Sequence, residues 1–141
     1  KSFYDHVNIN YLSNLIIIQK ILPLMSIKKF GRILLSSSTG VKFGGGKLTG
    51  LYSLTKHMNE FFFNNYKDFY KKNILINSLR IGVTKTKLHK KVKGKNMKKR
   101  VNLIPLGRMA STYEVAKYIY FYSSNLNSLT TNEIIDISGG E

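Results

Sequence analysis

The sequence predicts an α/β fold with a parallel β-sheet. Two short and mostly apolar runs, Ile33 to Leu35 and Ile74 to Leu79, have the length of strands that are covered on both faces. Each run follows a longer segment, residues 3–25 and residues 51–71, that is predicted to be helical. Helices that alternate with buried strands are typical of βαβ units, in which the strands run parallel.

The composition bounds the class of protein. The 141 residues suffice for one domain with a real core, but they are few for a complete dinucleotide-binding fold. The absence of cysteine excludes disulfides, Cys-ligated zinc and thiol catalysis, and no metal site is expected. A cysteine-free chain suits the cytoplasm, which is the expected location. No apolar run approaches the roughly 18–20 residues of a membrane span, and no signal peptide is recognisable, so no membrane partner is expected.

The charge is strongly basic, at +16 from 23 Lys and Arg against 7 Asp and Glu. A nucleic acid or another anionic partner would explain this excess. A compositional bias toward Lys, Asn and Ile, with a solvated basic surface, explains it equally simply. We favour the second interpretation, and a nucleic-acid partner is not expected.

Residues 3–25 are predicted to form a helix that starts near Asp5, where a carboxylate complements the helix dipole. Its apolar residues are too many for one exposed face, so we expect it to pack against the sheet and against another subunit; they are Val7, Leu12, Leu15, Ile16, Ile18 and Leu22. Lys28, Lys29 and Gly31 are predicted to end this helix.

The strand from Gly31 ends in Ser36, Ser37 and Ser38, at the sheet edge where open α/β folds place their ligands. A Gly-rich loop leads to the next helix, where Tyr52 and Lys56 are four residues apart and share one face. An ammonium beside a phenol favours the phenolate, so the pKa of Tyr52 is expected to be lowered.

Residues 31–56 resemble the active-site region of the short-chain dehydrogenase/reductase family, which combines a Ser after a central strand with Tyr-x-x-x-Lys on the next helix. The resemblance implies a Rossmann-like, doubly wound parallel sheet. It implies an NAD(P)-dependent oxidoreductase that interconverts a hydroxyl and a carbonyl by hydride transfer, with NAD or NADP as cofactor. Tyr52 would transfer the proton, Lys56 would hold the nicotinamide ribose, and Ser38 would bind the substrate oxygen. Ser37 remains the alternative if the strand carries a bulge.

The resemblance also assigns roles outside this region. Asn10 falls in the register of a family Asn that holds a water relaying protons to Lys56; without the resemblance, a capping or surface Asn is an equally good interpretation. After the second strand, Gly82, Thr84 and Thr86 match the motif that binds the nicotinamide carboxamide, with Ile81 in place of the usual Pro.

Nine of the residues from Lys85 to Arg100 are basic. In the family this segment covers the substrate, which predicts a cationic lid over a small anionic or sugar-derived substrate, such as a nucleotide sugar, an acidic sugar or an acyl-carrier protein. A solvated surface loop is the alternative. The helix from Leu51 is rich in aromatic residues that could stack on bases; they include Phe61, Phe62, Phe63 and Tyr66. In the family this helix packs against its copy, so the resemblance instead implies a homodimer or homotetramer.

The C-terminal segment carries further family features. Ser111 or Thr112 is predicted to start a helix, Glu133 to Ile137 to form the last strand, and Gly139-Gly140 matches the terminal Gly-Gly of the family. The resemblance therefore spans residues 1–141 but only the C-terminal half of the family's domain, so we expect a fragment that lacks the N-terminal cofactor-binding half and is inactive alone. Two rival hypotheses are a basic nucleic-acid-binding module and a catalytically dead remnant that only mediates interactions.

Overall fold

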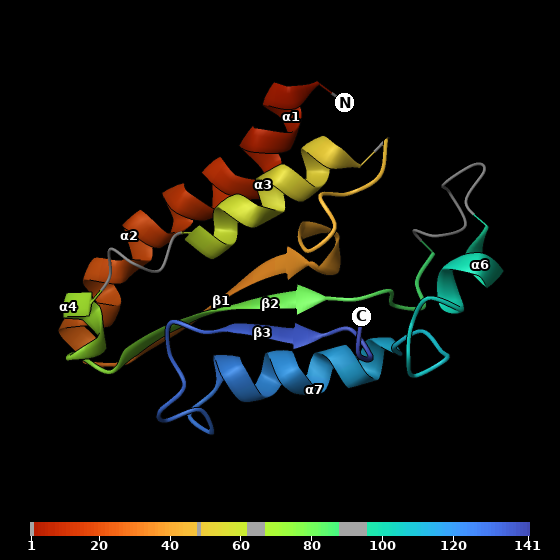
Figure 1. The fold of residues 1–141 in the computed structure, drawn as a ribbon. Helices are drawn as coiled ribbons and strands as arrows, with labels where there is room; N and C mark the ends of the chain where they lie inside the picture. Colours follow the sequence, from red (N-terminus) through yellow and green to blue (C-terminus); the bar gives the residue numbers. More distant parts are fainter. Residues whose placement is uncertain (1, 48, 62–66, 88–95) are drawn as a thin grey trace.

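A computed structural model describes residues 2–47, 49–61, 67–87 and 96–141. Its three strands, β1 (Gly31–Ser38), β2 (Ile74–Ile81) and β3 (Ile134–Ile137), form one parallel sheet in the order β1-β2-β3. Helices α2 (Ser13–Lys28) and α3 (Gly50–Phe61) lie over one face, and α7 (Thr112–Ser123) lies over the other (Figure 1). The predicted α/β fold is confirmed, as the part of a Rossmann-like sheet that this chain contains.

The first helical segment is not one regular helix. Helix α1 (Phe3–Val7) starts with a capping box between Ser2 and Asp5, a π-helical turn (Asn8–Leu12) follows, and α2 then continues to Lys28. The predicted stop at Gly31 is wrong, because Lys29 takes the left-handed conformation (φ 51°) that ends the helix. Gly31 instead starts β1, where a Cβ would lie 2.5 Å from Met25 Sδ. A larger residue here would have to displace the Met25 side chain.

The main core lies between α2 and the sheet. Buried side chains of the helix meet those of both central strands: Ile18, Leu22, Ile33, Leu35, Ile74 and Ile76. These residues come from the apolar runs that predicted the strands and from the helix before them. The predicted burial of the helix against the sheet is confirmed.

The second helical segment is also divided. Helix α3 ends at Phe61 and the short helix α4 (Lys67–Tyr70) precedes β2. Residues 62–66, with Phe62, Phe63 and Tyr66, lie outside the described ranges. Four lysines of the predicted lid, Lys90, Lys91, Lys93 and Lys95, also lie outside them, and helix α6 (Met97–Val101) follows. In the described part of the chain, no helix has the length and apolar character needed to cross a membrane.

Helix α7 begins as its sequence predicts. Ser111 is the N-cap, and its hydroxyl and the Glu114 carboxylate bond each other's backbone N–H groups in a capping box. Arg108 adds a bidentate ion pair, with its Nη1 and Nη2 at 3.0 and 2.7 Å from the two Glu114 oxygens. These bonds, with that from Arg108 first among them, lower the pKa of Glu114 to about 2.

Glu114 is therefore expected to contribute to acid stability. A carboxyl whose pKa is lowered on folding stabilises the protein above its unfolded pKa, and this contribution is lost as the pH falls through the folded pKa. The thermal midpoint of Glu114→Gln should lie below that of the wild type at neutral pH, and the gap should close between about pH 4.5 and about pH 2. A gap that stays constant down to about pH 2 would contradict this assignment.

Candidate active site

Three segments that carry predicted site residues meet at the carboxyl edge of the sheet. Ser38 is the last residue of β1, Tyr52 and Lys56 lie on α3, and Gly82 directly follows β2. Because parallel strands end at one edge, the end of β1 and the loop after β2 are neighbours, and Ser38 is paired with Ile81. Helix α3 packs against β1 and against residues 39–41, which follow β1 (Figure 1).

Tyr52 lies within reach of Ser38, whose hydroxyl acts as a hydrogen-bond partner that lowers the pKa of Tyr52. Ser38 Oγ also accepts the Gly40 N–H at 3.2 Å, as the cap of the short 3-10 helix Thr39–Val41. Burial raises the pKa of Tyr52 above its ordinary value, and the hydrogen bond with Ser38 opposes this only in part. The lowered pKa expected from the neighbouring ammonium is therefore wrong for this structure. Tyr52 keeps its proton at neutral pH.

Lys56 is directed to the end of β1. Its Nζ donates to the Ser36 carbonyl oxygen at 2.9 Å and lies 5.9 Å from the centre of the Tyr52 ring. Burial lowers the pKa of Lys56. The Lys56 ammonium is thus close enough to bind a group that lies beside the Tyr52 ring. Its hydrogen bond to the Ser36 carbonyl oxygen keeps the ammonium at the end of β1.

The structure separates the two candidate serines. Ser37 is 2% exposed, and its Oγ donates to Glu60 Oε1 at 2.5 Å. Ser38 is only partly buried and bonds Tyr52. Ser37 faces the side of the sheet that α2 and α3 cover, and its hydroxyl is engaged there by Glu60 and the Lys56 carbonyl oxygen rather than by Tyr52. This geometry favours Ser38 for the site.

Asn10 lies in the π-helical turn and contacts α3. Its Nδ2 donates to Thr55 Oγ1 at 3.0 Å, and its carbonyl oxygen accepts the Nδ2 groups of Asn14 and Asn59, each at 2.9 Å. A carbonyl oxygen has two lone pairs, so a water relaying protons to Lys56 would share this oxygen with two amides. The relay remains a prediction. Sequence reasoning missed Asn14 and Asn59; the i,i+4 spacing of Asn10 and Asn14 was the available signal.

The loop after β2 is held close to the C-terminal segment. Thr84 forms an isolated parallel bridge with Ala110, made by Lys85 N–H to Ala110 O (2.8 Å) and Ala110 N–H to Val83 O (2.9 Å). These two bonds do not use the Thr84 N–H. Thr86 lies further along and is exposed. The structure thus brings Gly82 and Thr84 to the edge that carries Ser38, and Thr86 lies at the outer end of the same loop.

Gly82 is packed too closely to accept a side chain. A Cβ at this position would lie 2.7 Å from Ser138 Cα and 3.2 Å from the Ile137 carbonyl oxygen. We expect Gly82→Ala to push the end of β2 from the segment after β3 and to destabilise the protein by about 1–3 kcal/mol, the range seen for overpacking. Urea unfolding checks this, with Gly107→Asn, at an open left-handed position (φ +69°), as a milder control. An unchanged urea midpoint in Gly82→Ala would contradict the close packing.

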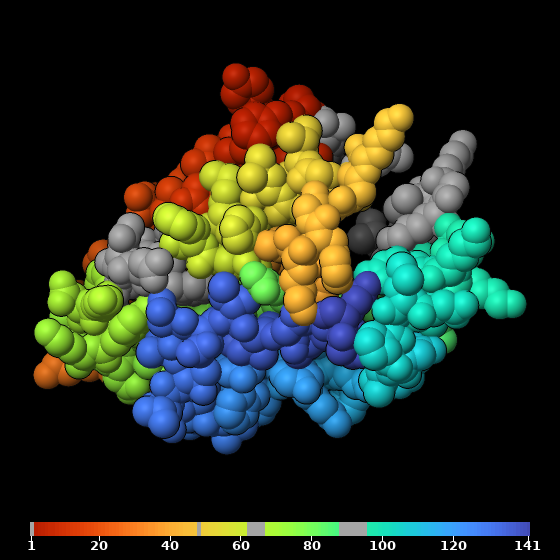
Figure 2. All heavy atoms as spheres, in the orientation of Figure 1, coloured from red at the N-terminus to blue at the C-terminus, as the bar shows by residue number. Residues whose placement is uncertain are grey.

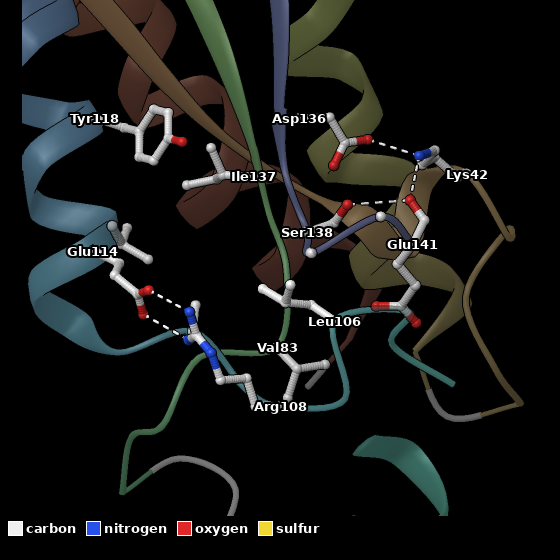
Figure 3. Close-up of a pocket in the computed structure, with 14 residues that line it drawn as sticks. Lys42, Val83, Leu106, Arg108, Glu114, Tyr118, Asp136, Ile137, Ser138 and Glu141 are labelled. Carbon is white, nitrogen blue, oxygen red and sulfur yellow. Dashed lines mark hydrogen bonds and ion pairs between the residues drawn. The ribbon is translucent and has the colours of Figure 1, made fainter. Parts of the chain in front are cut away.

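A pocket of about 410 Å³ lies beside α7 and β3, away from Tyr52. Figure 3 shows its charged side chains paired: Arg108 with Glu114, and Lys42 with Asp136 at 2.8 Å. Lys42 also bonds the Glu141 carbonyl oxygen, and Figure 2 shows the C-terminal residues against the segment after β1. None of Ser38, Tyr52 and Lys56 lines this pocket. The pocket therefore meets the candidate active site only at Val83, between Gly82 and Thr84.

The parallel sheet covered by helices, with Ser, Tyr and Lys side chains at the carboxyl ends of its strands, places the chain in the class of Rossmann-like α/β proteins. Within that class, a family model described as "Enoyl-(Acyl carrier protein) reductase" matches residues 1–141. The chain belongs to this family, the short-chain dehydrogenases/reductases.

Related proteins agree with this membership. The chain is 31% identical over 135 residues to 3-oxoacyl-[acyl-carrier-protein] reductase FabG of Aquifex aeolicus, covering 95% of this chain and 54% of that protein. It is 28% identical over 141 residues to FabG of Thermotoga maritima, again covering 54% of the relative. The chain thus spans about half the length of these relatives.

Solved structures show the same fold. The structure described as "ElxO with NADP Bound" has a TM-score of 0.86 and 27% identity, and the match covers 98% of this chain and 57% of that one. The TT0495 protein of Thermus thermophilus has a TM-score of 0.90 at 19% identity, covering 98% of this chain and 59% of that one. The second likeness concerns the fold alone.

Proposed function

We propose that this chain is the catalytic half of an NADPH-dependent reductase that converts a ketone of an acyl thioester into a hydroxyl. The observation that carries the proposal is the pairing of Ser38 with a protonated Tyr52 beside Lys56. The class of substrate is suggested by the FabG relatives, which are named as 3-oxoacyl-[acyl-carrier-protein] reductases. We also propose that an N-terminal half of the protein completes the cofactor site.

Each side chain then has one task. Tyr52 donates its phenolic proton to the carbonyl oxygen of the substrate, and Ser38 donates a hydrogen bond to the same oxygen as negative charge develops there. Lys56 holds a positive charge near the phenol and favours its deprotonated product. Asn10 fixes the π-helical turn against Thr55 and so supports α3.

The described residues fit a nicotinamide cofactor. The Lys56 ammonium has three donors, and its strong bond to Ser36 O uses one of them. The parallel bridge between Thr84 and Ala110 does not use the Thr84 N–H group. Gly82 has no side chain, so the backbone there can lie close to a bound group. Lys56 would hold the nicotinamide ribose, with Tyr52 beside it, and Gly82, Thr84 and Thr86 would bind the carboxamide. When bound, this cofactor supplies the hydride. NADP is proposed over NAD because ElxO is described with NADP bound.

We propose that the complete protein is a homodimer or homotetramer in the cytoplasm that uses α2 and α3 as its subunit contact. Large apolar side chains are exposed on these two helices: Ile16, Ile17, Leu24, Ile27, Leu51, Leu54 and Phe61. Large apolar side chains that are exposed on neighbouring helices are typical of an interface where they form a patch. Their exposure agrees with the sequence-based expectation that the first helix packs on two sides.

The pH dependence of the reduction follows from Tyr52. Its pKa is raised by burial above the ordinary value of 10.0, so the proton that it must donate is present below this pKa and lost as the pH rises through it. We expect kcat/KM for ketone reduction to show no gain between about pH 6 and about pH 9 and to fall at higher pH. A rate that rises through the neutral range would contradict Tyr52 as the proton donor.

The direct test begins with the coding region upstream of Lys1. A continuous frame that encodes a strand and a Gly-rich turn would supply the other half of the fold. The complete protein is then assayed for oxidation of NADPH by an acetoacetyl thioester, on coenzyme A and on acyl-carrier protein. Turnover with either thioester supports the proposal. NADPH binding without turnover on any thioester would reject the substrate class.

A further inference from the structure

A buried ion pair joins α3 to the sheet next to the candidate active site. The Glu60 side chain is 2% exposed and that of Arg80 is 22% exposed. Arg80 Nε donates to Glu60 Oε1, and Arg80 Nη2 donates to Oε2, both at 2.7 Å. This bidentate geometry limits both the distance and the rotation between the two groups.

Two more side chains complete the cluster. Ser37 Oγ lies 2.5 Å from Glu60 Oε1 and 3.4 Å from the Lys56 carbonyl oxygen, and His57 Nδ1 lies 3.1 Å from Glu60 Oε2. Each carboxylate oxygen therefore has two partners. Burial raises the pKa of Glu60, but the hydrogen bonds from Arg80, Ser37 and His57 outweigh it, so the net shift is downward and Glu60 stays ionised.

The cluster adjoins three segments of the proposed site. Ser37 directly precedes Ser38, Glu60 lies one helical turn after Lys56, and Arg80 lies two residues before Gly82. Ser37 and Arg80 are register partners across β1 and β2, so their side chains stand side by side under α3. Glu60 thus bonds both strands from one position on the helix.

We propose that Glu60 and Arg80 are positioning residues, whose ion pair sets the placement of α3 on the sheet and thereby aligns Tyr52 and Lys56 with Ser38. This inference rests on the proposed function. A buried ion pair gives little net stability over apolar residues of the same size. Its directional bonds, in contrast, hold the helix in one rotation, which apolar contacts do not. The pair therefore serves alignment more than stability.

The test compares three variants of the complete protein: Arg80→Lys, Glu60→Gln and the apolar pair Glu60→Leu/Arg80→Met. Arg80→Lys keeps the charge but loses the planar fork, so kcat should fall at least about tenfold while KM for NADPH changes less than about threefold. Glu60→Gln should lower both kcat and the thermal midpoint. The apolar pair should return the midpoint close to that of the wild type while kcat stays at least about tenfold down.

Arg108→Met is the matched control, since Arg108 forms a bidentate pair of the same geometry with Glu114 that is exposed and away from Tyr52. Its kcat should equal that of the wild type. Recovery of kcat together with the midpoint in the apolar pair, or an unchanged kcat in Arg80→Lys, would overturn the proposal, because the cluster would then serve packing only.

Failure of the proposed function is distinguishable. If the wild-type complete protein reduces no ketone, the proposed function is rejected. The positioning role is then tested by amide hydrogen exchange in residues 50–61. If the variant Glu60→Leu/Arg80→Met has the thermal midpoint of the wild type but exchanges these amides at least about fivefold faster, the ion pair positions α3. Wild-type exchange in that variant overturns it.

Discussion

Tyr52→Phe in the complete protein should abolish most of the turnover and leave NADPH binding nearly intact. The substitution removes the hydroxyl that Ser38 binds and leaves a ring of the same shape in a site that is already buried. Loss of a positioned general acid typically costs about 10²–10⁴-fold in rate. Because the ring remains, we expect the cofactor dissociation constant to change less than about threefold.

The measurement is kcat from NADPH absorbance, with the dissociation constant from cofactor fluorescence. Tyr4→Phe is the matched control, because Tyr4 is 76% exposed on α1 and the same hydroxyl is removed there. Turnover of Tyr52→Phe within about threefold of the wild type would refute its role as proton donor. A parallel loss of turnover and of NADPH binding would point to a disordered site instead.

Ile76→Ala should strongly destabilise the protein. Ile76 is 0% exposed and packs in the cluster that includes Ile33, Leu22 and Ile18. Truncation of a buried Ile to Ala removes transfer free energy and leaves a cavity, which together cost about 2–5 kcal/mol. Its backbone bonds to the loop before β3 are unaffected by the change, so the loss comes from packing.

Urea unfolding followed by circular dichroism checks this prediction. Leu129→Ala is the control, since Leu129 is 87% exposed in the loop before β3 and its truncation should change the unfolding free energy by less than about 0.5 kcal/mol. Equal effects at the two positions would mean that the face of β2 toward α2 is not the core.

Local sequence signals predicted much of the fold. The apolar runs at Ile33 and Ile74 located the two central strands, since only covered strands are apolar on both faces. The Ser111 and Glu114 pair located the start of α7, because a capping box depends on residues three apart. The basic end of the first helix at Lys28 and Lys29 was also predicted, but Lys29 rather than Gly31 takes the left-handed conformation that ends it.

The candidate site was predicted only in part. The four-residue spacing of Tyr52 and Lys56 placed them on one helical face from the sequence alone. The choice between Ser37 and Ser38 could not be made in this way, because it depends on which of the two hydroxyls is engaged by Glu60, 23 residues from Ser37. The pKa of Tyr52 was predicted with the wrong sign, since a neighbouring charge is visible in the sequence whereas burial is not.

The sequence by itself thus determined the class of fold, the family and the residue types at the edge of the sheet, because these depend on short-range spacing. Only the tertiary structure decided that Glu60 and Arg80, 20 residues apart, form a buried pair under α3. Each looks like an ordinary surface charge in its own element. Packing alone removes them from water, and a carboxylate removed from water requires the partners that Arg80, Ser37 and His57 provide.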